Sequence, residues 1–440
     1  MSISWQPLGE TTFLIARGSG LPLLYAPLQG LIMEVNDAYA VCFREALAGD
    51  ADAAHAIGVE PMMLDRLTAV SPKALKKFNP TWPDSFEPTA VTLFLTHKCT
   101  LRCTYCYCEG GTGSDIDWPV LEASVRFALG NAVRLGRDLT VAFHGGDVGA
   151  RWPLFTRAVE FIEATAAEAN VNVLMNIGTN GFYSEPQAAF IAQHMRSATV
   201  SIDGLPEVHD RCRVTPGTEP SLGTVLGSVR IFEKHGLPYS IRMTVTAEAL
   251  PLLAESVEFL CEHSRASIIR AEPLYLRGRA SASGLDAPEP HAFVEAFRTA
   301  STVAQRYGRR LTYSGARPAG VVPAFCSYPD PTFGVTPDGD LTCCYEVLHP
   351  DDPLSKEFFY GHVDADGSAI HTDGARIAAI RDGAAQRRAG CAECFCVFAC
   401  AGDCAAKAFD GGRVAGETSG RCEITRALVL DMLESALGGA

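Results

Sequence analysis

The chain has 440 residues, of which 47% are hydrophobic, so it is long enough to form several domains with buried cores. Acidic residues outnumber basic residues by 51 to 37, and the net charge of −14 disfavours a large phosphate-binding surface, so we expect no nucleic-acid partner. The N-terminus lacks a secretory signal and no apolar run is long enough to span a bilayer, which predicts a cytoplasmic protein without a membrane partner.

The N-terminal segment is predicted to form strands followed by helices. The stretch "TTFLIARGSGLPLLYAPLQGLIMEVN" (11–36) reads as strands interrupted by glycine, and "DAYAVCFREALAG" (37–49) reads as a short helix that ends at glycine. Further helical pieces run to about residue 77. We assign residues 1–85 to an N-terminal α+β domain.

The middle of the chain, residues 86–310, alternates short apolar runs with amphipathic stretches. This alternation is typical of strand-helix units around a parallel sheet. Helices such as 118–135 carry proline near their start and apolar residues spaced by three and four. The expected strands are 91–95, 139–144, 172–178, 198–203, 239–245 and 267–272. The fold class is therefore α/β, with a partial (β/α)6 TIM-like barrel.

The C-terminal segment, residues 311–440, is rich in glycine, proline and cysteine and shows little periodicity. A large apolar core is not expected there, so another source of order is needed. The whole chain has 16 cysteines, and a reducing compartment keeps thiols free. Metal ligation is the expected use of many of these cysteines.

A first cysteine motif, CxxxCxxC, follows the first barrel strand and consists of Cys99, Cys103 and Cys106. Active sites of such barrels lie at this end of the strands. Three thiolates can hold three irons of a four-iron four-sulfur (4Fe–4S) cluster and leave the fourth iron open to a cofactor. For this motif alone, a structural zinc site is the alternative.

The spacing, with Tyr105 before the third cysteine, resembles the radical S-adenosylmethionine (SAM) superfamily. Its members bind the amino and carboxylate groups of SAM at the open iron. An electron from the cluster then cleaves SAM to methionine and a 5′-deoxyadenosyl radical, which abstracts hydrogen from a substrate.

Motifs at the following strand ends extend the resemblance. "HGGD" supplies Gly145, Gly146 and Asp147, where the family usually has two glycines and a glutamate that meet the methionyl amino group of SAM. The aspartate is one methylene shorter than that glutamate, so its carboxylate reaches less far toward SAM. His144 is expected to be a hydrogen-bonded core histidine. The resemblance further implies SAM contacts from Asn180, Ser201, Asp203 and Arg213. No residue is assigned a catalytic role toward the substrate.

The C-terminal cysteines resemble the SPASM domain, an extension of radical SAM enzymes that carries two auxiliary 4Fe–4S clusters. The resemblance implies three clusters in total, and zinc ribbons are the alternative reading. One auxiliary cluster would take Cys391, Cys394, Cys400 and Cys422, and the other would take Cys326, Cys344 and Cys404.

The second ligand set lacks a fourth cysteine, because Gly320 stands where fully ligated relatives have one. Either Cys343 completes the set or one iron stays open to a substrate thiol. Adjacent side chains on a strand point to opposite faces, so we favour the open iron over joint ligation by Cys343 and Cys344. Cys396 lies among the other ligands and is a further substitute. The remaining cysteines, Cys42, Cys108, Cys212 and Cys261, are expected to pack in the core.

Radical SAM enzymes with this extension mainly mature ribosomally made peptides or oxidise a sulfatase residue. The sulfatase class has an aspartate after the cysteine that Cys344 matches, and here that position is Tyr345.

The N-terminal segment resembles the winged-helix domain, related to PqqD, that holds a leader peptide; a barrel-capping extension is the alternative. We therefore expect an oxidoreductase-like enzyme that installs a thioether or carbon-carbon crosslink in a precursor peptide. The alternatives are a sulfatase-maturase-like oxidase and a non-enzymatic electron carrier. The expected reducing partner is a flavodoxin or ferredoxin.

Overall fold

The computed structural model describes residues 3–50, 60–83, 85–107, 113–317, 320–330, 332–412 and 417–438. Cys108, which was expected in the core, lies outside these ranges. The chain divides into two compact units. Unit 1 comprises Met1–Pro83, Ser314–Cys326 and Asp382–Ala440, and unit 2 comprises Asp84–Tyr313 and Ser327–Arg381. The division into three domains stays a prediction.

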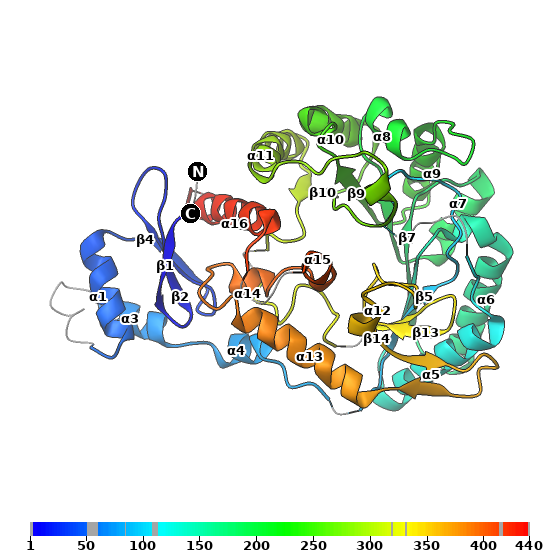
Figure 1. Cartoon of the computed structure of the whole chain (residues 1–440), viewed down its shortest axis with the longest axis horizontal. Helices are drawn as coiled ribbons and strands as arrows, with labels where there is room; N and C mark the ends of the chain where they lie inside the picture. Colours follow the sequence, from blue (N-terminus) through cyan, green and yellow to red (C-terminus); the bar gives the residue numbers. More distant parts are fainter. Residues whose placement is uncertain are drawn as a thin grey trace. The chain divides into compact units, whose positions relative to one another are not determined.

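Unit 2 is built on a parallel sheet whose strands follow one another in chain order (Figure 1). All six predicted strands are present, and a short additional strand extends the order, so the predicted α/β partial barrel is confirmed. The strands are β5 (Ala90–Phe94), β6 (Leu139–His144), β7 (Val173–Thr179), β8 (Ser197–Ser201), β9 (Tyr239–Val245), β10 (Ile268–Pro273) and β11 (Arg310–Thr312).

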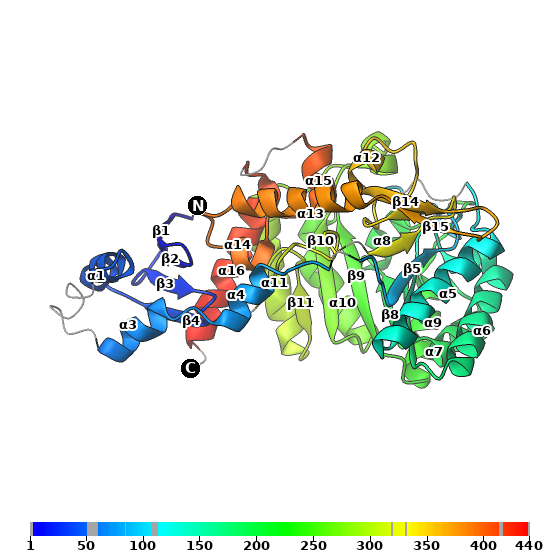
Figure 2. The ribbon, with the colours of Figure 1, turned by 90° about the horizontal axis from the view of Figure 1, so that it is seen from below.

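Helices cover the outer face of this sheet, as Figures 1 and 2 show. They are α5 (Trp118–Leu135), α6 (Trp152–Glu168), α7 (Glu185–His194), α8 (Pro206–Cys212), α9 (Leu222–Lys234), α10 (Leu253–His263) and α11 (Pro290–Arg306), with short 3-10 turns at Val148–Arg151, Leu250–Leu252 and Gly278–Ala282. Helix α5 has the predicted bounds, with proline in its first turn and Gly136 in the left-handed conformation at its end.

The alternation of side chains along β6 decides which residues face the barrel interior. Phe143 is buried and its ring lies 5.0 Å from that of Phe155 on α6, so this side of the strand faces the helices. The half-buried His144 belongs to the opposite side, because neighbouring side chains on a strand point to opposite faces. The carboxyl end of β6 therefore presents His144 toward the interior.

The sheet continues on the other side of β5 with strands that the sequence did not indicate. Strand β12 (Phe333–Val335) pairs in parallel with β5, and antiparallel partners follow. The result is an 11-stranded sheet. These added elements are β13 (Asp340–Thr342), α12 (Ser355–Phe358), β14 (Phe359–Val363) and β15 (Ile370–Thr372), after which α13 (Gly374–Ala389) begins.

Unit 1 contains a four-stranded antiparallel sheet in the order β1-β2-β3-β4. Its core combines residues of the strands and the first helices, including Leu24, Phe43 and Leu67. The side chain of Asn36 caps the first helix by accepting a hydrogen bond from Tyr39 N. The elements are β1 (Trp5–Gly9), β2 (Thr12–Ile15), β3 (Leu23–Ala26), β4 (Leu31–Glu34), α1 (Asp37–Leu47), α3 (Pro61–Thr68) and α4 (Pro72–Phe78).

The cysteine-rich C-terminal segment packs within the same unit against the N-terminal elements. The ring of Phe398 lies 6.3 Å from Phe13 and 4.5 Å from Phe78. The guanidinium of Arg388 covers the Phe78 ring and donates a hydrogen bond to its carbonyl oxygen. Both ends of the chain thus share one core. The C-terminal helices are α14 (Val397–Cys400), α15 (Ala405–Asp410) and α16 (Gly420–Gly438).

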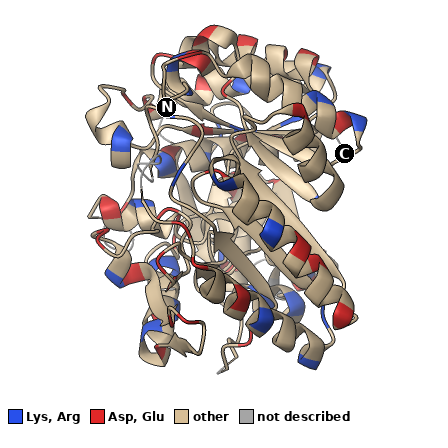
Figure 3. Cartoon of the chain, turned by 90° about the vertical axis from the view of Figure 1, so that its right-hand side faces the viewer, with Lys and Arg blue, Asp and Glu red and all other residues tan. Residues whose placement is uncertain are grey.

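No helix in the described ranges combines the length and apolar character needed to cross a bilayer. Lysine and arginine are interspersed with aspartate and glutamate along the ribbon seen in Figure 3.

Candidate functional site

The loop that carries Cys99, Cys103 and Cys106 leaves the carboxyl end of β5 and packs closely against the glycines after β6. Gly146 N donates to Thr96 O at 3.0 Å, and Asp147 N donates to Lys98 O at 2.9 Å. A Cβ atom at Gly146 would lie 2.0 Å from Lys98 O. Glycine is therefore required at this position by the close approach of two backbones.

The first two cysteines of the loop lie in a dry environment with polar groups aimed at their sulfurs. Burial raises the pKa of Cys99 to about 12 and that of Cys103 to about 11. Asn180 Nδ2 lies 3.4 Å from Cys99 Sγ, and Arg213 Nη1 lies 3.9 Å from Cys103 Sγ. Buried thiols of raised pKa are protonated near neutral pH, and metal coordination would release their protons. The pair is suited to ligation rather than to free thiolate chemistry.

The carboxylate of Asp147, predicted to contact SAM, accepts hydrogen bonds from other residues of the protein. Oδ1 accepts hydrogen bonds from Gly149 N and Tyr183 Oη, and Oδ2 accepts from Thr179 Oγ1 and Asn180 N, at 2.8 to 2.9 Å. The residue is 4% exposed, and burial raises its pKa against the effect of these donors. The contacts with Thr179, Asn180 and Tyr183 hold the ends of β6 and β7 together, and the contact with Gly149 caps the turn after Asp147.

Asn180 connects this carboxylate to the cysteine loop. Its Nδ2 donates to Thr100 Oγ1 at 2.9 Å, besides its contact with Cys99. Its Oδ1 accepts from Phe182 N at 2.8 Å. The backbone of Asn180 is thus fixed by Asp147, and its amide group lies against the loop.

Tyr105, Asp203 and Arg213 form a buried cluster on the other side of the loop. Tyr105 Oη donates a short hydrogen bond to Asp203 Oδ2, and Arg213 Nε donates to the same oxygen at 2.9 Å. The guanidinium also lies 5.2 Å from the centre of the Tyr105 ring. Ser201, the remaining predicted residue, is half-buried at the end of β8. The structure therefore brings Tyr105, Asp203 and Arg213 together.

His209 fixes this cluster and was not singled out from the sequence. Its Nδ1 accepts from Asp203 N at 3.3 Å, and its Nε2 lies 3.0 Å from Ser221 Oγ, whose hydroxyl donates to Arg213 O. Nε2 must therefore be the donor, and the imidazole is neutral. Burial lowers the pKa of His209 to about 4. The sequence feature that could have indicated His209 is its place as the first residue of "HDRCR", the motif that also supplies Arg213.

His144 has the hydrogen bond expected of a core histidine. Its Nε2 lies 3.3 Å from Tyr107 Oη, and burial lowers its pKa to about 4. Its ring lies 5.0 Å from that of Tyr345, whose hydroxyl is 2.8 Å from Thr92 Oγ1. Tyr345 therefore contributes an aromatic ring and a hydrogen-bonded hydroxyl beside the interior of the barrel.

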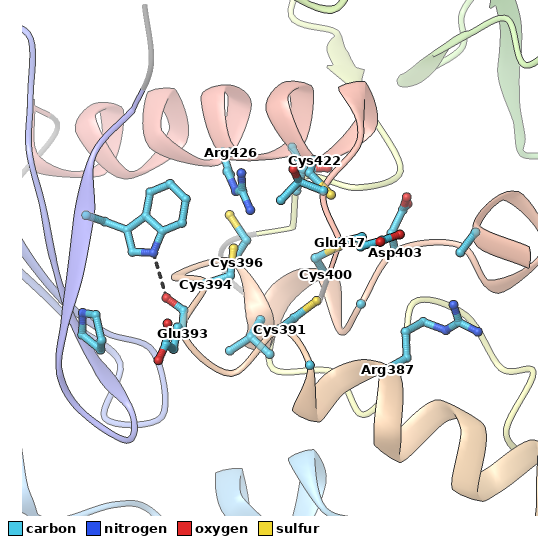
Figure 4. Close-up of a pocket in the computed structure, with 18 residues that line it drawn as sticks. Arg387, Cys391, Glu393, Cys394, Cys396, Cys400, Asp403, Glu417, Cys422 and Arg426 are labelled. Carbon is cyan, nitrogen blue, oxygen red and sulfur yellow. Dashed lines mark hydrogen bonds between the residues drawn. The ribbon is translucent and has the colours of Figure 1, made fainter. Parts of the chain in front are cut away.

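A second cysteine cluster lies in unit 1, where Cys391, Cys394, Cys400 and Cys422 line one cavity of about 340 Å³ (Figure 4). These are the residues predicted for one auxiliary cluster. Cys396 lines the same cavity.

Hydrogen bonds fix the polar surroundings of this cavity. Hydrogen bonds from Cys396 and Arg426 lower the pKa of Cys394 to about 6. The backbone carbonyl of Glu393 accepts a 2.7 Å hydrogen bond from Trp5 Nε1, dashed in Figure 4. The cavity is therefore lined by the four predicted ligands, by the sulfur of Cys396 and by the guanidinium of Arg426.

The other predicted ligand set is divided between the two units. Cys326 and Cys404 belong to unit 1, and Cys344 belongs to unit 2, so this set stays a proposal. Cys343 is buried, and its thiol donates to Phe358 O at 3.3 Å. This hydrogen bond occupies the thiol of Cys343 inside the sheet, as expected if Cys344 alone of the two is a ligand.

The spacing of the sulfurs bears on the choice between zinc and a cluster. Zinc–sulfur bonds of about 2.3 Å place the sulfurs of a tetrahedral site about 3.8 Å apart. Within the described ranges, no three of the predicted cysteine ligands have sulfurs within 4.8 Å of one another. The choice between zinc and iron-sulfur ligation by these cysteines stays a prediction.

Comparison with known proteins finds a family match for part of the chain. Residues 93–248 match the family model of the radical SAM superfamily. Over 159 residues the chain is 28% identical to the cysteine-type anaerobic sulfatase-maturating enzyme of Clostridium novyi, which covers 34% of this chain and 41% of that one. Over 205 residues it is 25% identical to the sporulation killing factor maturation protein SkfB of Bacillus subtilis, covering 45% of each. The chain spans about half the length of the curated relatives it matches.

Solved structures show the same fold. The structure of anSMEcpe with bound AdoMet superposes with a TM-score of 0.61 at 16% identity, covering 80% of this chain and 99% of that one. SuiB of Streptococcus suis bound to S-adenosylmethionine gives a TM-score of 0.51 at 14% identity, covering 97% and 99%. Residues 93–248 thus match the radical SAM superfamily, and the chain shares its fold with anSMEcpe and SuiB.

Proposed function

We propose that this protein is a radical SAM peptide maturase that installs a thioether or carbon-carbon crosslink in a ribosomally made precursor peptide. The observation that carries the proposal is the cysteine loop at the carboxyl end of β5, within the matched domain, with Asn180 and Arg213 aimed at its sulfurs. A 4Fe–4S cluster on Cys99, Cys103 and Cys106 would supply the electron that cleaves SAM to a 5′-deoxyadenosyl radical.

The residues around the loop would hold SAM and exclude water. Arg213 keeps its positive charge beside Cys103, where it favours the thiolate and, beyond it, the carboxylate of SAM. Asp203 and Tyr105 fix the direction of the guanidinium. The edge at Gly145 and Gly146 is proposed to meet the methionyl amino group, while Asp147 holds the neighbouring strand ends in place.

The N-terminal domain is proposed to bind the leader of the precursor. Its edge strand β4 borders a cavity of about 390 Å³ lined by apolar and aromatic residues, among them Met33, Tyr39, Phe43 and Met62. An extended peptide can add to such an edge through backbone hydrogen bonds and place its side chains in the cavity. SkfB is a maturation protein, and anSMEcpe has been solved with the Cp18Cys peptide, which supports a peptide substrate.

A sulfatase-maturase-like oxidase is the second candidate, because one relative is a sulfatase-maturating enzyme. Tyr345 weighs against it, since a tyrosine whose hydroxyl is paired with Thr92 does not replace an aspartate base. A simple electron carrier is disfavoured because it would not need the SAM-contacting motifs at the strand ends, which lie within the region that matches the radical SAM model. The reducing partner is proposed to be a flavodoxin or ferredoxin.

The first experiment tests the radical SAM assignment. Replacing Cys99, Cys103 and Cys106 with alanine should remove about a third of the iron and abolish reductive SAM cleavage, because one of three proposed clusters is lost. Cys261→Ala, which removes a buried thiol on α10, is the control and should retain both. Unchanged SAM cleavage by the triple variant would contradict the proposal.

The second experiment tests leader recognition without disturbing the shared core of unit 1. Met62 is 67% exposed at the cavity, so Met62→Asp should weaken binding of a fluorescent precursor encoded beside the gene and leave SAM cleavage intact. Val133→Asp on α5, where the valine is 54% exposed, is the matched control. Equal anisotropy titrations for the two variants would rule out this cavity as the leader site.

A further inference from the structure

The hairpin formed by β14 and β15 carries two histidines and an aspartate on one face. His362 and His371 are direct partners across the antiparallel pair, so their side chains project from the same face. Their rings stack with centroids 4.7 Å apart and an interplanar angle of 26°. Asp364 follows His362 by two residues, which returns its side chain to that face.

The three side chains already have nearly the spacing of metal ligands. His371 Nε2 lies 3.1 Å from Asp364 Oδ1 and 3.2 Å from Oδ2, and His362 Nε2 lies 3.6 Å from Oδ1. Zinc binds nitrogen and oxygen at about 2.0–2.2 Å, which places ligand atoms of a tetrahedral site about 3.3 Å apart. In the described ranges this is the one trio of His, Cys, Asp or Glu ligand atoms within 4.8 Å of one another. The three ligand atoms are therefore close enough together to share one ion.

The turn between the strands holds the aspartate in position. Asp364 N donates to Ala369 O at 3.0 Å, and Gly367 N donates to Asp364 O at 2.8 Å. Gly367 has a positive φ of 73°, a conformation that glycine adopts without steric cost. The backbone of the hairpin is therefore fixed around Asp364, which reduces the ordering needed on binding.

A further carboxylate lies beside the trio. Asp340 on β13 is the direct cross-strand partner of His362 on its other side. Burial raises the pKa of Asp340, and the nearby imidazoles of His362 and His349 oppose that shift. Ligating histidines are commonly supported by such an outer carboxylate, which orients the ring and raises its basicity.

We propose that His362, Asp364 and His371 form a binding site for a divalent transition metal of the zinc type. Two imidazoles and one carboxylate suit zinc and its neighbours better than magnesium or calcium, which prefer all-oxygen sites. Both histidine side chains are about half exposed, at 56% and 52%, so an ion can enter and keep water as a further ligand. The ion joins β15, the edge strand of the large sheet, to β14 and so stabilises the hairpin.

The test compares the full-length, anaerobically purified, iron-loaded protein with the His362→Gln/His371→Gln double variant. Both are dialysed against zinc, and bound zinc is measured by elemental analysis. The wild type should bind one more equivalent of zinc per chain than the double variant. Zinc bound by cysteines is the same in both proteins and does not contribute to this difference. Replacing His235 and His263, exposed histidines at the ends of α9 and α10, with glutamine should cause no loss.

Hydrogen exchange localises the ion. Zinc should slow amide exchange across residues 359–372 in the wild type and leave this segment unchanged in the double variant. Substitution of a residue that only hydrogen-bonds a metal ligand weakens metal binding by about 10–100-fold. Because Asp364 is proposed to bind the ion directly, Asp364→Asn should weaken zinc binding by more than this. Equal zinc content in wild type and double variant, or unaltered exchange in 359–372, would overturn the proposal and leave a hydrogen-bonded surface cluster only.

Discussion

Replacing Asp147 with asparagine would test whether this residue organises the site or contacts SAM directly. Each carboxylate oxygen accepts one backbone N–H and one hydroxyl: Gly149 N and Tyr183 Oη on Oδ1, Asn180 N and Thr179 Oγ1 on Oδ2. Asparagine keeps one acceptor oxygen. Whichever way its amide group is turned, one of the two fixed N–H groups faces an NH₂ group.

The size of the effect follows from these contacts. A buried donor left without an acceptor costs about 1–3 kcal/mol, and the remaining bonds lose their charge assistance. We expect Asp147→Asn to lower the free energy of unfolding by about 2–4 kcal/mol. SAM affinity should fall as well, because the backbone of Asn180 loses its anchor while its amide lies against Cys99 and Thr100.

Chemical denaturation and equilibrium binding of SAM, measured on the same preparations, check this expectation. Asp138→Asn, at an exposed position before β6, is the matched control and should change stability by less than about 0.5 kcal/mol. If Asp147→Asn lost SAM binding while keeping wild-type stability, the carboxylate would be a direct SAM ligand and the structural reasoning would be refuted.

Three further predictions concern the same unit. Gly146→Ala should abolish SAM cleavage, because the added Cβ would displace the cysteine loop at Lys98 O. Gly130→Ala is the control and should retain cleavage, because a Cβ at that position meets nothing within 4 Å. Equal activity of the two variants would refute the close-approach argument. The pKa of His209 is lowered to about 4 in the folded protein, so below about pH 6.5 the unfolded chain binds more protons than the folded chain and stability falls as pH decreases. Between pH 7.5 and 5.5 this histidine should cost about 1.4 kcal/mol of the free energy of unfolding. Denaturation measured at both pH values should show that His209→Gln does not have this part of the pH dependence. Cys343→Ala should keep its iron content and peptide modification, and loss of about four irons would make Cys343 a ligand.

The sequence alone determined the barrel and the order of its site residues. Each strand from β5 to β10 is a short apolar run, and each site motif follows a strand, so local periodicity was sufficient to place them at one edge of the sheet. The spacing of Cys99, Cys103 and Cys106 was readable for the same reason, since the residues are neighbours in the chain.

The tertiary structure decided everything that depends on residues far apart in sequence. The parallel pairing of β12 with β5 joins segments more than 200 residues apart, and no local pattern marks it. The core shared by Phe13, Phe78 and Phe398 likewise joins both ends of the chain. The hydrogen bonds that Asp147 accepts from Thr179, Asn180 and Tyr183 join residues more than 30 positions apart, so no local pattern indicated them. Histidines nine residues apart became a paired cluster only through the register of β14 and β15. Periodicity records which side of an element is buried, but the partner that covers it is chosen by packing across the whole chain.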